Sequence, residues 1–116
     1  MHEASLIESV LHMASSQMRR HGGKRIHRLT LRIGALSGVA PDALAFAFEA
    51  LKRGTAAREA VLDVEYLPLR LFCPACRREF EPPGYLGACP ACGSWQCEVR
   101  QGRELDLVSL EVSNEA

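Results

Sequence analysis

Four cysteines in two matched segments have the spacing of a metal site. The segments are Cys73-Pro74-Ala75-Cys76 and Cys89-Pro90-Ala91-Cys92. The short turn inside each segment points both sulfurs inward and lets backbone amides point at them, and proline stiffens that turn by fixing its φ. Two such knuckles supply four thiolates, the closed ligand set of structural zinc. The pattern predicts a zinc site that stabilises a fold, with Cys73, Cys76, Cys89 and Cys92 as ligands.

These cysteines have two other interpretations. The first is a pair of disulfides, which is not favoured, because the chain opens Met1-His2-Glu3 with no basic segment and no long apolar run that would direct it to an oxidising compartment. We therefore expect a soluble, cytoplasmic protein. Iron in the same cage, as in a rubredoxin-like electron carrier, is the second alternative, since thiolates accept either metal.

The fifth cysteine, Cys97, is expected to be a free, semi-buried thiol rather than an auxiliary redox or metal-binding group.

The amino terminus is a second candidate for metal binding. The terminal amine of Met1, together with the backbone nitrogen and the imidazole of His2, can reach one ion and close two small chelate rings. Glu3 can add a further backbone nitrogen. Such a nitrogen-rich, planar set suits Ni(II) or Cu(II). By spacing alone, however, a solvated histidine near a free terminus is favoured, with Glu3 complementing the dipole of a first helix.

Composition bounds the class of protein. A chain of 116 residues that is 47% hydrophobic makes one ordinary domain, or a modest domain plus a small one stapled by metal. Fourteen basic residues balance fourteen acidic ones, so no general attraction to nucleic acid or anionic membranes is expected. One dense basic stretch is interpreted as a solvated face, with partner docking as the alternative. Its residues are Arg19, Arg20, Lys24, Arg25, Arg28 and Arg32.

No enzyme is predicted. The segment Gly22-Gly23-Lys24 lacks the upstream glycine and the following hydroxyl residue of a phosphate-binding loop, so neither ATPase nor GTPase activity is expected. No Ser/His/Asp set can be singled out either, because the four histidines fall in or near the first helix and the strand after it.

Apolar periodicity predicts two helices. The first spans about residues 3–21 and stops at Gly22-Gly23, and the second begins at Pro41 and ends at Gly54. Their apolar stripes are Leu6, Ile7, Val10, Leu11, Ala14 and Met18, and then Leu44, Ala47, Phe48 and Leu51.

Alternating apolar residues predict strands at 28–33, 62–66 and 105–112. Asp63 and Glu65 could lie opposite the arginines of the first strand, which suggests that these two strands are neighbours. The apolar positions change parity after Pro68 and again near Val108, which predicts a twist at the first place and a bulge or rotation at the second.

The order of these elements predicts an α+β fold. It consists of a small mixed sheet with two helices and an inserted zinc-ribbon-like four-cysteine lobe. The predicted boundaries are 1–68 plus 98–116 for the α/β lobe and 69–97 for the zinc-binding lobe. Pro68 marks the way into the inserted lobe and Gly102 the way out.

The motifs taken together resemble the HypA/HybF family, the nickel metallochaperones of [NiFe]-hydrogenase maturation. The resemblance covers nearly the whole chain in order. It rests on the opening Met1-His2-Glu3, the runs LRIGALSGV at 31–39 and ALAFAFE at 43–49, and the two knuckles followed by Gly93-Ser94.

This resemblance implies a function and its residues. It implies a nickel lobe that binds Ni(II) through Met1, His2 and Glu3, and a zinc lobe that uses the four knuckle cysteines. Members pass nickel towards the hydrogenase large-subunit precursor with a partner GTPase (HypB-like), and some also serve urease through its maturation proteins. The alternative that the residues leave open is a zinc-ribbon adaptor for protein or nucleic acid, with no nickel role.

Overall fold

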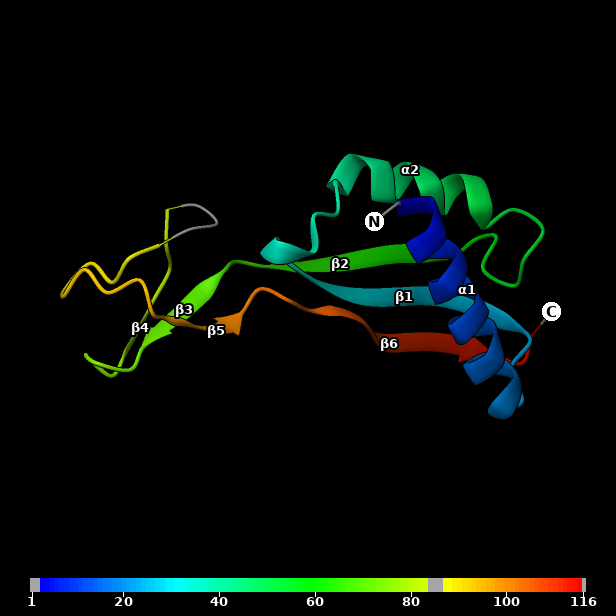
Figure 1. Ribbon diagram of the computed structural model, residues 1–116. Coiled ribbons are helices and arrows are strands. Elements are labelled where there is room, and N and C mark those ends of the chain that lie inside the picture. Colours follow the sequence, from blue (N-terminus) through cyan, green and yellow to red (C-terminus); the bar gives the residue numbers. More distant parts are fainter. Residues whose placement is uncertain (1–2, 84–86, 116) are drawn as a thin grey trace. The chain divides into compact units, whose positions relative to one another are not determined.

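The computed structural model describes residues 3–83 and 87–115, which divide into two compact units (Figure 1). Among these residues, the first unit comprises 3–32, 38–65 and 106–115, and the second comprises 33–37, 66–83 and 87–105. The lobe boundaries expected from the sequence, 1–68 plus 98–116 and 69–97, stay a prediction. No helix in the described part of the chain is long and apolar enough to cross a membrane.

Both predicted helices are present. Helix α1 spans Glu3–Arg20 and helix α2 spans Pro41–Leu51, with Pro41 in its first turn as expected from the fixed φ of proline. Helix α2 ends before the predicted stop at Gly54. Between the two helices in the chain, a short 3₁₀ helix, η1, spans Ala35–Ser37.

Six strands form two sheets of three strands each. The first sheet has the order β2-β1-β6 and the second has the order β4-β3-β5. The predicted neighbours, β1 and β2, are therefore adjacent, and the cysteine-bearing segment is inserted between β2 and β6 of one sheet. The strands are β1 (Arg25–Gly34), β2 (Val61–Leu67), β3 (Arg70–Cys73), β4 (Arg78–Phe80), β5 (Glu98–Gln101) and β6 (Leu105–Ser113).

The core of the first unit is formed by the two helices, which contact each other, and by β1. Its side chains are the apolar stripes that the sequence predicted, and burying each one larger than alanine contributes about 1.5–3 kcal/mol. Only Leu6 and Leu51 of those stripes are less than fully buried. Its most buried members are Ile7, Val10, Ala14, Leu29, Leu31, Leu44 and Phe48.

The sheet of the first unit also carries the predicted cross-strand charge pairs. Arg28 of β1 forms ion pairs with Asp63 of β2 and, at 2.8 Å, with Glu111 of β6. Arg32 pairs with Glu65 at 3.3 Å. The hydrogen bond and charge of Asp63 raise the pKa of Arg28. These side chains are about half exposed, so solvent screens the ion pairs. The pairs therefore contribute more to the register of the strands than to the stability of the fold.

The second unit contains strands that the sequence patterns did not reveal. β3 pairs antiparallel with β4, placing Leu71 opposite Phe80, and with β5, placing Leu71 opposite Val99. Leu69, Leu71 and Cys73 are buried, so the predicted change of parity after Pro68 is confirmed. In β6 the half-buried positions also change parity, between Leu107 and Leu110, as predicted.

Candidate metal sites

The four knuckle sulfurs lie together in the second unit. Their Sγ atoms are all within 4.8 Å of one another, with Cys73 3.7 Å from Cys92 and Cys76 3.8 Å from Cys89. A tetrahedral zinc ion with Zn–S bonds of about 2.3 Å requires sulfurs about 3.8 Å apart. The donor set and its spacing therefore fit a four-thiolate zinc site.

The two knuckles are built as the same turn. Cys73 ends β3, and the N–H of Arg77 donates to the Cys73 carbonyl at 2.7 Å; in the second knuckle the N–H of Gly93 donates to the Cys89 carbonyl at 2.8 Å. The residue after each second cysteine is left-handed, with φ of 55° at Arg77 and 76° at Gly93. The first knuckle is also the connection between β3 and β4, because Cys73 is paired with Arg78.

The electrostatics of the cluster differ between its members. The backbone N–H groups of Cys92 and Ala91 hydrogen-bond to the Cys89 sulfur and lower its pKa to about 6, so this thiol is ionised at neutral pH. The Cys76 pKa is raised to about 12, first by its contact with the Cys92 sulfur and then by its contact with Cys89. Binding a divalent ion through all four thiolates thus requires Cys76 to lose its proton.

Cys97 lies outside the set of four. Its thiol is half-buried and donates to the Ser94 carbonyl at 3.5 Å. Burial, and then the charge of Cys73, raises the pKa of Cys97, which keeps it protonated and poorly nucleophilic at neutral pH. Among the described residues, the four knuckle cysteines are the only group of histidine, cysteine or acidic side chains placed to hold a metal ion.

The candidate nickel site falls at the start of the first unit. Met1 and His2 lie outside the described residues, so this ligand set stays a prediction. Glu3 is the first residue of α1, and its Oε2 accepts a hydrogen bond of 2.9 Å from the backbone N–H of Ala40. Ala40 is the N-cap of α2 and provides no side-chain cap of its own. The Glu3 carboxylate therefore joins the starts of the two helices, where its charge favours the dipole of α2.

Comparison with known proteins identifies the family. The model of a family described as hydrogenase/urease nickel incorporation, metallochaperone, HypA, matches residues 1–112. The hydrogenase maturation factor HypA of Picosynechococcus sp. is 42% identical, and that of Geobacter metallireducens is 44% identical, each over 112 residues that cover 97% of this chain and 99% of the relative.

Solved structures match the same family. The solution structure of the Ni metallochaperone HypA from Helicobacter pylori matches with a TM-score of 0.69 and 28% identity, and the match covers 99% of this chain and 100% of that chain. The α+β fold with an inserted four-cysteine lobe is thereby confirmed, as is the resemblance carried by the motifs. A zinc-ribbon adaptor without a nickel role is not favoured. The chain belongs to the HypA family, the nickel metallochaperones of hydrogenase maturation.

Proposed function

We propose that the amino terminus of this chain carries nickel as cargo. The ligands are the amine of Met1, the backbone nitrogen and imidazole of His2, and the backbone nitrogen of Glu3. The observation that carries the proposal is the role of Glu3, whose carboxylate is already engaged with Ala40 while its backbone begins α1. The Glu3 side chain therefore stabilises the fold, and the main chain up to and including the Glu3 nitrogen supplies the nitrogen atoms that Ni(II) prefers.

The two metals have opposite tasks in this proposal. Nickel must leave on docking, which suits a few nitrogen ligands at a chain end better than a closed cage. Zinc, held by Cys73, Cys76, Cys89 and Cys92, stays bound and stabilises the second unit. The partners are a HypB-like GTPase and the hydrogenase large-subunit precursor, in the cytoplasm, with urease maturation proteins as further recipients. The family's role in nickel incorporation supports this assignment.

The test is a nickel titration of untagged, zinc-loaded protein at neutral pH, followed by absorption spectroscopy. The parent should bind one nickel with the spectrum of nitrogen ligation, whereas His2→Ala and a copy extended by one residue before Met1 should lose it. Binding should weaken as the pH falls, because the amine, the imidazole and any ligating amide must first lose protons. His12→Ala is the matched control, since His12 is an exposed histidine on α1.

Mass spectrometry of the purified parent measures whether Met1 is its first residue, which the comparison requires. If all four proteins then bind nickel alike, or none binds it, the terminal site is wrong and the nickel ligands must be sought elsewhere in the chain.

A further inference from the structure

A groove of about 500 Å³ lies between the last turns of α1 and strand β6, within the first unit. Gln17 and His21 line it from the helix side. Its other wall is the outer strand of the sheet and is mostly apolar. The lining residues of that wall are Leu107, Val108, Ser109, Leu110 and Val112.

Strand β6 is an edge strand. In the sheet order β2-β1-β6, no other described strand lies on its outer side. An unpaired edge offers a row of N–H and C=O groups to another strand, and proteins usually block such rows with lysine, proline or a very short strand. β6 has nine residues and neither lysine nor proline; of its two carboxylates, Glu111 is already paired with Arg28 and Asp106 does not line the groove. Val108 remains 42% exposed. The edge is therefore open to pairing.

The end of this groove is basic. Arg19 and Arg20 are exposed in the last turn of α1; Arg20 adjoins the groove residue His21, whereas Arg19 is two positions from both Gln17 and His21 and lies on the opposite side of the helix. Lys24 follows, and its backbone N–H donates to the carbonyl of Ser113 at 2.8 Å, which fixes it at the end of β6. None of these three cations has an ion pair with a described residue.

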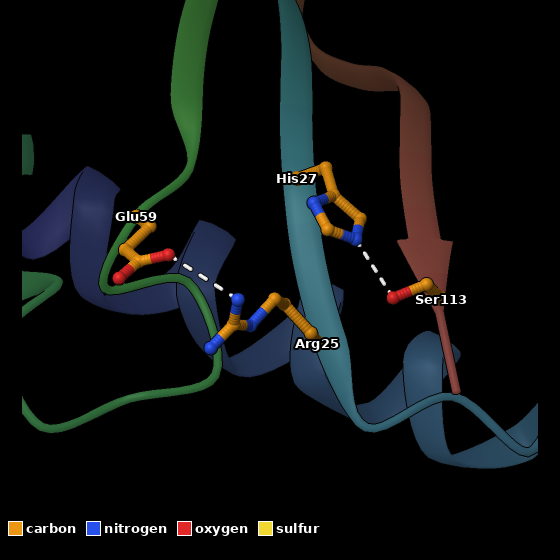
Figure 2. A network of polar contacts seen from close by, with 4 residues as sticks. All are labelled: Arg25, His27, Glu59 and Ser113. Atoms are coloured by element: carbon orange, nitrogen blue, oxygen red, sulfur yellow. Dashed lines mark hydrogen bonds and ion pairs between the residues drawn. The ribbon is translucent and has the colours of Figure 1, made fainter. Parts of the chain in front are cut away.

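The other half of the basic stretch behaves differently. Arg25 pairs with Glu59 at 3.2 Å, and Figure 2 shows this pair beside the hydrogen bond between His27 and Ser113. Arg28 and Arg32 are paired across the sheet, as described above. The structure thus divides the stretch into a neutralised set on β1 and an unneutralised set, Arg19, Arg20 and Lys24, of which Arg20 and Lys24 flank the groove.

We propose that the edge of β6 and this groove bind an extended segment of a partner protein, with alternating apolar side chains and carboxylates at one end. The unpaired strand edge selects an extended backbone, which would add a strand to the sheet. The groove takes the apolar side chains, and Arg20 and Lys24, the two unpaired cations that flank it, take the carboxylates. Charge complementarity thus fixes the chemistry of the segment and the end of the groove at which its acidic residues lie.

This docking surface is separate from the proposed nickel terminus. Helix α1 has 18 residues and is therefore about 27 Å long, with Glu3 at one end and the groove residues near the other. A segment bound at β6 would leave the amino terminus accessible. The inference does not rest on the nickel ligands, because variants of the groove should keep nickel binding and the His2→Ala variant should keep segment binding.

The test uses the full, zinc-loaded chain and a fluorescein-labelled peptide of alternating valine and threonine that ends in three glutamates. A twin peptide ends in three lysines. Fluorescence anisotropy should show binding of the acidic peptide only, and hydrogen exchange should show new protection of β6 amides. Arg20→Glu with Lys24→Glu should weaken binding at least about tenfold, and added salt should weaken it in the parent.

Two further variants make the test specific. Val108→Asp places a charge in the groove at an exposed position and should also abolish binding, while circular dichroism reports that the fold is retained. Arg53→Glu with Arg58→Glu is the matched control, since both arginines are exposed, have no ion pair with a described residue and do not line the groove. This control should bind the acidic peptide as tightly as the parent.

Several results would overturn the proposal. Equal binding of the lysine peptide, or protection confined to residues outside β6 and the end of α1, would exclude this occupant. Sedimentation that reveals a dimer with β6 protected in the absence of peptide would assign the edge to a second copy of the chain. Tighter binding of a single-stranded oligonucleotide, lost in the charge-reversal variant, would assign the cations to a nucleic acid.

Discussion

At the scale of single residues, Glu3 shows how one position can serve two tasks with different atoms. Its carboxylate accepts the N–H of Ala40, and its backbone nitrogen belongs to the proposed nickel ligands. Substitutions can separate these tasks, because alanine removes only the side chain whereas proline also removes the backbone N–H, and proline is tolerated in the first turn of a helix.

We expect Glu3→Ala to lose about 1 kcal/mol of stability with its hydrogen bond and to keep nickel. Glu3→Pro should lose a similar amount of stability and also lose nickel binding, because a tertiary amide nitrogen cannot be deprotonated to bind the ion. Thermal unfolding and nickel titration of both variants provide the two measurements. Nickel binding by the proline variant with an unchanged spectrum would remove Glu3 from the ligand set.

The two kinds of cysteine should also respond differently to substitution. Cys76→Ser removes one of four converging sulfurs, so the variant should retain less than one zinc per chain. Cys97→Ser removes a thiol that lies outside the set of four and donates to the Ser94 carbonyl, so it should retain one zinc. Metal analysis by mass spectrometry after gel filtration measures both, and it also distinguishes zinc from iron. Loss of zinc in the Cys97 variant would make this thiol a member of the site.

At the residue scale, sequence spacing is informative where the geometry is local. A C-x-x-C turn brings its own two sulfurs together whatever the rest of the chain does, so spacing alone pointed to the cluster that the structure shows. The contact between Glu3 and Ala40 joins residues 37 positions apart and depends on how α1 and α2 pack. No pattern near Glu3 encodes that contact, which is why the sequence suggested only a general helix-dipole role.

At the scale of elements, two segments of the second unit lie close together at a pair of glycines, Gly34 and Gly102. The Gly34 N–H donates to the Glu104 carbonyl at 2.8 Å, and the Leu36 N–H donates to the Gly102 carbonyl at 2.7 Å. The end of β1 therefore lies beside the segment before β6. A Cβ built on Gly34 would lie 2.1 Å from the Gly102 carbonyl oxygen. Because this neighbour is backbone, it cannot move aside as a flexible side chain would.

We therefore expect Gly34→Ala to destabilise the second unit by at least about 2–3 kcal/mol, or to prevent its folding. Gly38→Ala is the comparison, since Gly38 has a φ of 73° but no atom within 4 Å of its would-be Cβ, and only the conformational cost of about 1 kcal/mol applies. Urea unfolding of both variants gives the two values. A loss at Gly34 no larger than that at Gly38 would mean that the two segments separate easily.

Element length decided which parts of the fold could be predicted. The 18 residues of α1 and the ten of β1 are long enough for their periodicity to stand out, and both were found. β4 has three residues and β5 has four, too few for an alternating pattern to be distinguished from a loop. Their pairing with β3 is nevertheless what gives the second unit its sheet.

At the scale of the whole molecule, the two units depend on different forces. The first unit buries apolar side chains from both helices and from β1. In the second unit, the buried apolar side chains are few, Leu69 and Leu71 among them, and two of the knuckle cysteines are themselves buried. A four-thiolate zinc site contributes on the order of 10 kcal/mol to so small a module. Zinc is therefore expected to stabilise one unit and not the other.

Removing zinc with a chelator should consequently unfold the second unit while the first keeps its helices. Hydrogen exchange followed by mass spectrometry should show protection lost in β3, β4 and β5 and retained in α1 and α2. The amides of Gly34 and Leu36 decide where the boundary lies, because they donate to carbonyls of the second unit. If these two amides lose protection together with β3, residues 33–37 unfold with the rest of the second unit. If they stay protected, zinc stabilises only the narrower lobe of residues 69–97. Loss of protection throughout α1 and α2 would contradict both boundaries and make the chain a single cooperative unit.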